Sequence, residues 1–168
     1  MTKSELLVGM ADIHFCKGPA KYTCLGLGSC IGLALVDNRT QISGMIHIML
    51  PATFPDRPVD KIGKFADVGI PELIRVMSLH GAEPRRMVAA YCGGAAVFKT
   101  DGVGSHLDIG ARNADAVKKF LNENRIPVCG VDVGGSSGRT MIYHSDSGEI
   151  TVRTVLGGER TLCNLKAG

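Results

Sequence analysis

The stretch CIGLALVDNRTQISGMIHIML, residues 30–50, decides the fold because it contains two apolar strands separated by a turn. The turn Asp37-Asn38-Arg39-Thr40 consists of residue types that favour tight turns, so the two halves are predicted to form an antiparallel hairpin. Side chains alternate between the faces of a strand. If opposed residues have numbers that sum to 77, one face is a core face of aliphatic residues: Ile31, Leu33, Leu35, Ile42, Ile46 and Ile48.

The other face of this hairpin places a thiol beside an imidazole. The same sum pairs Cys30 with His47, and directly opposed Cβ atoms lie about 4.5–5.5 Å apart. A slip of one residue in register would put the pair on opposite faces. The rest of this face is smaller and more polar, which leaves room beside the thiol: Gly32, Ala34, Val36, Gln41, Ser43 and Met45.

A cysteine next to a histidine has the chemistry of acyl transfer. The thiolate is the nucleophile, and a neighbouring imidazole accepts the thiol proton and later delivers it to a leaving group. Gly26 and Gly28 precede Cys30 and allow unusual backbone turns, so N–H groups around Ser29 and Cys30 are candidates for an oxyanion site.

Each feature also has a structural interpretation. Cysteine is among the most often buried residue types, and a histidine between Ile46 and Ile48 fits a hydrogen-bonded core position. It is the combination of glycines, thiol, turn and opposed histidine that favours catalysis. The same glycines spell GxGxxxG, but neither a βαβ context nor a P-loop lysine supports a nucleotide site.

Composition limits the remaining possibilities. The 168 residues are the length of one domain (1–168), with no apolar segment long enough to span a membrane and no secretory signal, so we expect a cytoplasmic protein. The six cysteines are expected to be free thiols. Neither cysteines nor histidines have metal-site spacing, and no cofactor is expected. The net charge of +3 lacks a basic stripe with aromatic residues, which disfavours nucleic-acid binding.

The rest of the chain alternates strands with two helices. Helices are predicted from about Lys64 to His80, and after a glycine-rich loop (102–110) from a cap at Asn113. Residues 51–61 read as an irregular loop near the site. The prediction is an α/β layered sandwich with mostly antiparallel sheets and two main helices. Strands are expected at 5–10, 12–16, 86–91, 127–133, 139–144 and 149–155.

Two motifs, TCLGLGSC (23–30) and HIMLP (47–51), contain the thiol and the histidine. Later motifs follow in order: Ala66-Asp67-Val68, Gly93-Gly94-Ala95, Ile109-Gly110, Arg112-Asn113, Asp132, Gly134-Gly135 and Gly138-Arg139. Together these motifs resemble the CheD family of chemoreceptor glutamine deamidases.

The resemblance implies hydrolysis of glutamine side chains to glutamate on methyl-accepting chemotaxis receptors, with release of ammonia. It implies Cys30 as nucleophile and His47 as base, an α/β sandwich like that of cysteine deamidase toxins, and a CheC-type phosphatase as a partner. A non-catalytic module that docks on receptors or on such a phosphatase is the alternative function. A third hypothesis, less favoured, is a cysteine hydrolase that acts on another amide or ester.

One position departs from the family pattern. Six residues before the nucleophile the family usually has threonine as the third catalytic group, and this chain has Cys24, with Thr23 beside it. A thiol is a weak hydrogen-bond partner for an imidazole. Three outcomes remain open: a backbone carbonyl orients His47, Thr23 takes the position, or the enzyme is slower.

Overall fold

The computed structural model describes residues 2–96 and 108–166, and these form two five-stranded sheets and two α-helices. The first sheet has the strand order β1-β3-β8-β9-β10, in which β1 and β3 are parallel and the other neighbours antiparallel. Its strands are β1 (Ser4–Leu7), β3 (Ala20–Leu27), β8 (Arg139–His144), β9 (Glu149–Thr154) and β10 (Gly158–Asn164).

The second sheet has the order β2-β5-β4-β6-β7, and only its β6/β7 pair is parallel. Its strands are β2 (Ile13–Lys17), β5 (Ile42–Ile48), β4 (Ile31–Asp37), β6 (Val88–Gly93) and β7 (Val128–Val133). The helices are α1 (Ala66–Leu79) and α2 (Ile109–Glu123), with short 3-10 turns η1 (Ile62–Lys64) and η2 (Pro84–Arg86). The α/β architecture with mostly antiparallel pairing is therefore as predicted.

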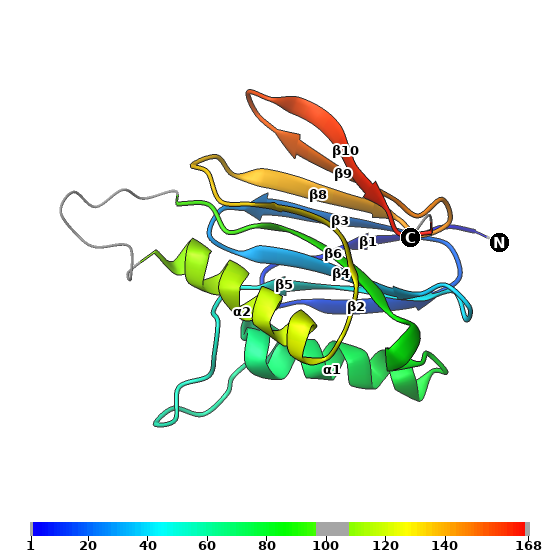
Figure 1. Cartoon of the computed structure of the whole chain (residues 1–168), viewed down its shortest axis with the longest axis horizontal. Coiled ribbons are helices and arrows are strands. Elements are labelled where there is room, and N and C mark those ends of the chain that lie inside the picture. The colour runs from blue at the N-terminus through cyan, green and yellow to red at the C-terminus, as the bar shows by residue number, and fades with distance from the viewer. Residues whose placement is uncertain (1, 97–107, 167–168) are drawn as a thin grey trace.

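The two sheets pack face to face, and both helices cover the outer face of the second sheet (Figure 1). Buried aliphatic side chains of β4 and β5 form one core with the apolar faces of α1 and α2. A second core lies between the sheets and contains Tyr22, Ala34, Met45 and Tyr143. Both faces of the central β4/β5 hairpin are thus buried, and the predicted aliphatic face is the one that packs against the helices.

The register of the β4/β5 hairpin differs by two residues from the predicted one. Gly32, not Cys30, lies opposite His47, so opposed numbers sum to 79. A two-residue turn at Asn38-Arg39 needs positive φ angles at both residues, which neither has. The chain instead uses a four-residue loop, 38–41, that ends on Gln41 at φ 58°. A shift of two preserves the faces, so Cys30 and His47 remain on the same side.

The start of the second helix also differs from the prediction. The side chain of Asp108 caps α2 by accepting a hydrogen bond from Ala111 N at 3.2 Å. Asn113, the predicted cap, is the fifth residue of the helix and is fully buried. Most of the predicted 102–110 loop falls at 102–107, outside the described residues, while Gly110 is helical.

Two strands were not predicted. The glycines of β3 disguise it as a loop that leads into the hairpin, although its buried residues alternate over most of its length. β10 is largely exposed and polar, and it is held by its antiparallel pairing with β9. Neither described helix has the length and apolar character needed to cross a bilayer.

Candidate active site

His47 is held in a single orientation by backbone and side-chain contacts. The imidazole is 1% exposed, and its Nδ1 lies 3.1 Å from the carbonyl oxygen of Val8. A carbonyl only accepts, so Nδ1 carries the proton and Nε2 is left as the basic atom. Nε2 is buried and has no hydrogen-bond partner among the described residues. Burial lowers the pKa of His47, which keeps the ring neutral and able to accept a proton at neutral pH.

Cys24 reaches the same ring from the other sheet. Its Sγ lies 3.4 Å from His47 Nδ1, and its side chain is fully buried. Burial raises the pKa of Cys24 far above its ordinary value, so the residue is a neutral thiol. The structure thus brings both Cys24 and a backbone carbonyl, that of Val8, to the nitrogen at which a third catalytic group would act. Thr23 makes no hydrogen bond to His47 among the residues described.

Cys30 precedes β4 by one residue and packs against the core between the sheets, the core that also contains Cys24. It is diagonal to His47 across the hairpin, a relation in which Cβ atoms are separated by at most about 7–8 Å. No hydrogen bond joins the two side chains in the described part of the chain. Cys30 is half-buried, and this burial raises the pKa of its thiol above the ordinary value. The resting pair is therefore a neutral thiol and a neutral imidazole.

Three successive carbonyls around Cys30 are turned toward the protein and bound there. Gly28 O accepts from Ala95 N at 2.8 Å, and Cys30 O accepts from Gly94 N at 2.9 Å. Between them, Ser29 O accepts from the side-chain amide of Asn113 at 2.9 Å. The loop that carries the thiol is consequently fixed at each peptide.

Two consecutive N–H groups of this loop are available as donors. No hydrogen bond from the N–H of Ser29 or Cys30 is found within the described residues. The N–H of Gly28, in contrast, is bonded to Gly26 O at 3.0 Å, and Gly26 has a φ of 66°. Consecutive free amides form an anion-binding concavity. This arrangement supports an oxyanion site at Ser29 and Cys30, and Gly28 contributes through its carbonyl, which Ala95 N binds.

The double glycine at the end of β6, Gly93 and Gly94, permits this close approach. Gly93 has a φ of 119°, and a Cβ added there would lie 2.1 Å from Cys30 O. Its carbonyl accepts from Gly134 N at 3.1 Å. The 134–138 loop is in turn organised by the nearly buried Arg139, which donates to Asp132 Oδ1 at 2.7 Å and to Ser137 O at 3.1 Å. The glycine-rich segments thus support the loop of Cys30.

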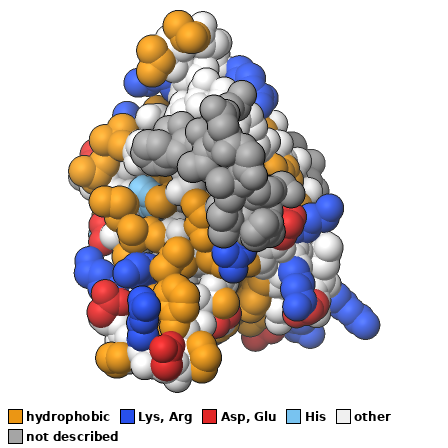
Figure 2. Space-filling model, turned by 90° about the vertical axis from the view of Figure 1, so that its left-hand side faces the viewer, with side chains coloured by type: hydrophobic (Ala, Val, Ile, Leu, Met, Phe, Trp, Pro, Cys, Tyr) orange, Lys and Arg blue, Asp and Glu red, His pale blue; other side chains and the backbone are white. Residues whose placement is uncertain are grey.

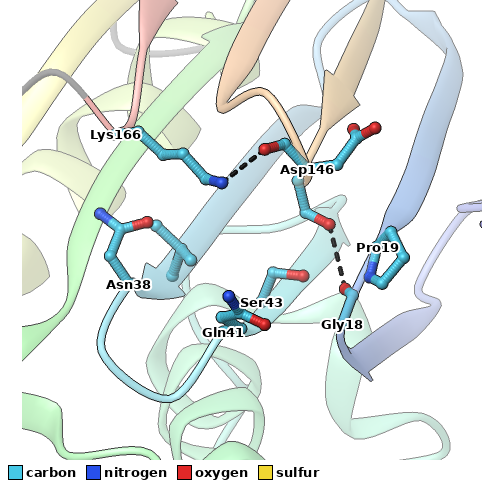
Figure 3. Close-up of a pocket in the computed structure, with 9 residues that line it drawn as sticks. Gly18, Pro19, Asn38, Gln41, Ser43, Asp146 and Lys166 are labelled. Atoms are coloured by element: carbon cyan, nitrogen blue, oxygen red, sulfur yellow. Dashed lines mark hydrogen bonds between the residues drawn. The ribbon is translucent and has the colours of Figure 1, made fainter. Parts of the chain in front are cut away.

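The site end of the sandwich presents a partly apolar surface. Figure 2 shows this end, where hydrophobic side chains gather with basic and acidic groups at their margin. A separate pocket of about 350 Å³ lies at the opposite end of the hairpin, beside Asn38, Gln41 and Ser43 (Figure 3). Since Cys30 and His47 are at the far ends of β4 and β5, this pocket is distinct from the candidate site.

The sequence leaves open that a backbone carbonyl orients His47, but it does not identify Val8 as its source, and it does not predict the Asn113 amide as a supporting group. A backbone carbonyl has no sequence signal, and Asn113 read equally well as a helix cap. The predicted site residues Cys24, Cys30 and His47 gather at one end of the core between the sheets, although by a different register. No cluster of three or more metal-ligating side chains occurs among residues 2–96 and 108–166.

The chain is similar to a known protein family and to several proteins that carry the family's name. Residues 49–154 match the profile described as "CheD chemotactic sensory transduction". A protein of Clostridium botulinum (strain Eklund 17B / Type B), named probable chemoreceptor glutamine deamidase CheD, is 43% identical over 155 residues, 92% of this chain and 96% of that protein. Proteins of the same name from Clostridium novyi and Clostridium acetobutylicum are 42% and 41% identical, over 96% and 94% of this chain and 100% and 95% of their own.

Proposed function

This chain belongs to the CheD family of chemoreceptor glutamine deamidases, and we propose that Cys30 and His47 perform the family's reaction in it. That reaction is the hydrolysis of glutamine side-chain amides on chemoreceptors. The chain is a protein-glutamine glutaminase, and its product is a glutamate on the receptor together with ammonia. The single observation that best supports our assignment is the buried, neutral His47, whose Nδ1 donates to Val8 O and whose Nε2 has no hydrogen-bond partner among the described residues.

The first half of the reaction forms a thioester. His47 Nε2 takes the proton from Cys30 Sγ as the sulfur attacks the carboxamide carbon of the substrate glutamine. The carbonyl oxygen gains the negative charge, which the N–H groups of Ser29 and Cys30 stabilise. The protonated His47 then gives its proton to the amide nitrogen, the C–N bond breaks and ammonia leaves.

The second half regenerates the thiol. His47, again neutral, takes a proton from a water molecule that attacks the thioester carbon. The oxyanion of this second tetrahedral intermediate accepts hydrogen bonds from the same N–H groups, those of Ser29 and Cys30. When the C–S bond breaks, the proton returns to Cys30 Sγ and the substrate leaves as glutamate. No cofactor takes part in this scheme.

Proton transfer accompanies attack in this site. Burial raises the pKa of Cys30 and lowers that of His47, so the thiolate–imidazolium pair is disfavoured before the substrate binds. Substrate binding excludes water further and places the carbonyl against the free N–H groups, where the charge is stabilised as it forms.

The test compares three variants on a purified receptor cytoplasmic fragment, with deamidation read by mass spectrometry of its peptides. Cys30→Ala is expected to abolish deamidation, and His47→Ala to reduce it about 10²–10⁴-fold. Cys129→Ala is the matched control, because this exposed thiol contacts Asn164 O on the β7/β10 side and is not part of the site. Full activity in folded Cys30→Ala would refute the assignment.

We propose methyl-accepting chemotaxis receptors as substrates and the cytoplasm as the compartment, where all six cysteines are kept as free thiols. A CheC-type phosphatase is a further proposed partner, on the family resemblance. Titration of such a phosphatase into the Cys30→Ala protein tests this partnership as binding alone, because this variant cannot turn over a receptor. Retained signalling by Cys30→Ala in cells would instead favour the non-catalytic docking function.

A further inference from the structure

We propose that Asn113 is a positioning residue for the deamidation, which fixes the oxyanion-binding N–H of Cys30 by holding the peptide that contains it. This inference rests on the proposed function, because it assigns a task to one residue in that site. Asn113 lies on α2 and is fully buried, 84 residues along the chain from Ser29.

Asn113 connects the two strands that carry the reacting side chains. Its Nδ2 donates to Ser29 O, one residue before Cys30, and to Met49 O, two residues after His47, each at 2.9 Å. The last pair of the β4/β5 ladder is Ile31 with Ile48. The side-chain amide therefore continues the connection between the strands where their own pairing ends, and both protons of the NH₂ group are used.

The hydrogen bond to Ser29 determines where the next N–H points. A trans peptide is planar, so the carbonyl of Ser29 and the N–H of Cys30 point in opposite directions. With the carbonyl held on Asn113, the N–H is directed away from α2, and it has no partner among the described residues. If the amide were lost, rotation of this peptide would remove one of the two oxyanion donors.

The helix is placed for this task by a close backbone contact. A Cβ added to Gly110 would lie 2.5 Å from Ala95 O and 2.6 Å from Gly94 O, so the first turn of α2 packs directly on the segment that binds Gly28 and Cys30. Because Asp108 already caps the helix, capping does not explain a buried asparagine at position 113.

The experiment measures two reactions of Cys30 in Asn113→Ala. Deamidation of the receptor fragment passes through an oxyanion, whereas alkylation by iodoacetamide is a displacement at carbon and does not. We expect kcat for deamidation to fall about 10²-fold with KM little changed, since a lost oxyanion donor acts on the transition state. The rate of Cys30 alkylation, read from its own peptide, should stay within about twofold of wild type.

The matched control is Asn124→Ala, which removes the C-cap asparagine directly after α2, whose Nδ2 donates to Phe120 O at 2.8 Å, away from the site. The rates of deamidation and of Cys30 alkylation should both be unchanged in Asn124→Ala. If Asn113→Ala does not fold, Asn113→Ser, with one hydroxyl donor, is used for the same comparison.

A parallel loss of alkylation and deamidation would overturn the inference, because it would mean that Asn113 only supports the fold around Cys30. Unchanged deamidation in a folded Asn113→Ala or Asn113→Ser would also overturn it. Failure of the proposed function is a different result: wild-type protein would then not deamidate the receptor, or Cys30→Ala would do so.

Discussion

Gly32 lies directly opposite His47 across the β4/β5 ladder, so the imidazole is paired with a strand position that has no side chain. The space above Gly32 is occupied from the other sheet: a Cβ added there would lie 3.4 Å from Cys24 Sγ and 3.2 Å from Met141 Sδ. This is why a side chain of β3 can reach a histidine of β5. The site is therefore built across the core between the two sheets.

Cys24→Ala should lower kcat by less than about tenfold, because the Val8 carbonyl already fixes the protonated Nδ1 of His47. Steady-state deamidation of the receptor fragment measures this. His47→Ala is the reference for a lost base. If the kcat of Cys24→Ala were as low as that of His47→Ala, the thiol and not the carbonyl would be the group that orients the ring.

The pH dependence of kcat/KM should show an acid limb whose midpoint lies below about 6.5, the ordinary pKa of histidine. Burial lowers the pKa of His47, so the ring stays neutral and active until the pH falls through that lowered value. Alkylation of Cys30 by iodoacetamide should increase with pH and reach its midpoint above the ordinary thiol pKa, since burial raises the pKa of Cys30. Rapid alkylation at pH 6 would contradict a neutral resting pair.

Gly93→Ala should abolish deamidation and destabilise the protein. An alanine there has an unfavourable φ of 119°, and its Cβ would collide with Cys30 O. Thermal unfolding and the receptor assay measure the two effects. Gly134→Ala is the control: its φ is 88°, but nothing lies within 4 Å of an added Cβ. It should show only the conformational cost, about 1 kcal/mol, and keep most of the activity.

Asp37→Ala should lower the free energy of unfolding by about 1–3 kcal/mol, the cost of leaving its hydrogen-bond donors without an acceptor. The buried carboxylate accepts from Arg86 Nη2 at 2.9 Å, Glu83 N at 2.9 Å and Arg39 N at 3.1 Å. Burial alone would raise the pKa of Asp37, but these donors outweigh it and lower the pKa. Its contribution is thus present above its ordinary pKa, about 3.8, and is lost as the pH falls through the lower folded value.

Urea denaturation at neutral and acidic pH measures this contribution of Asp37. The exposed Asp60, which pairs with Lys64 at 3.9 Å, is the matched control, and Asp60→Ala should leave stability nearly unchanged. If Asp37→Ala and Asp60→Ala lost equal amounts of unfolding free energy, the buried position of Asp37 would have no special part in stability.

The aliphatic face of the hairpin could be read from the sequence because alternation with a period of two survives any even shift in register. The register itself depends on the φ angles of the 38–41 loop, which residue types alone did not settle. The role of Asn113 could not be assigned from the sequence, because an asparagine suits a helix cap as well as a buried hydrogen-bond donor. The choice depends on Asp108, five residues earlier, which caps the helix. The partners of the Cys30 loop come from distant segments, so no local pattern predicts them.

The three bound carbonyls at Gly28, Ser29 and Cys30 have a consequence for folding. Their donors are Ala95, Asn113 and Gly94, which lie more than sixty residues further along the chain. Contacts of such long range form slowly compared with a local hairpin. We therefore expect the β4/β5 hairpin to pair before its catalytic loop takes shape, so that recovered deamidase activity in a refolding experiment marks the docking of α2 and β6 and lags behind the return of sheet structure.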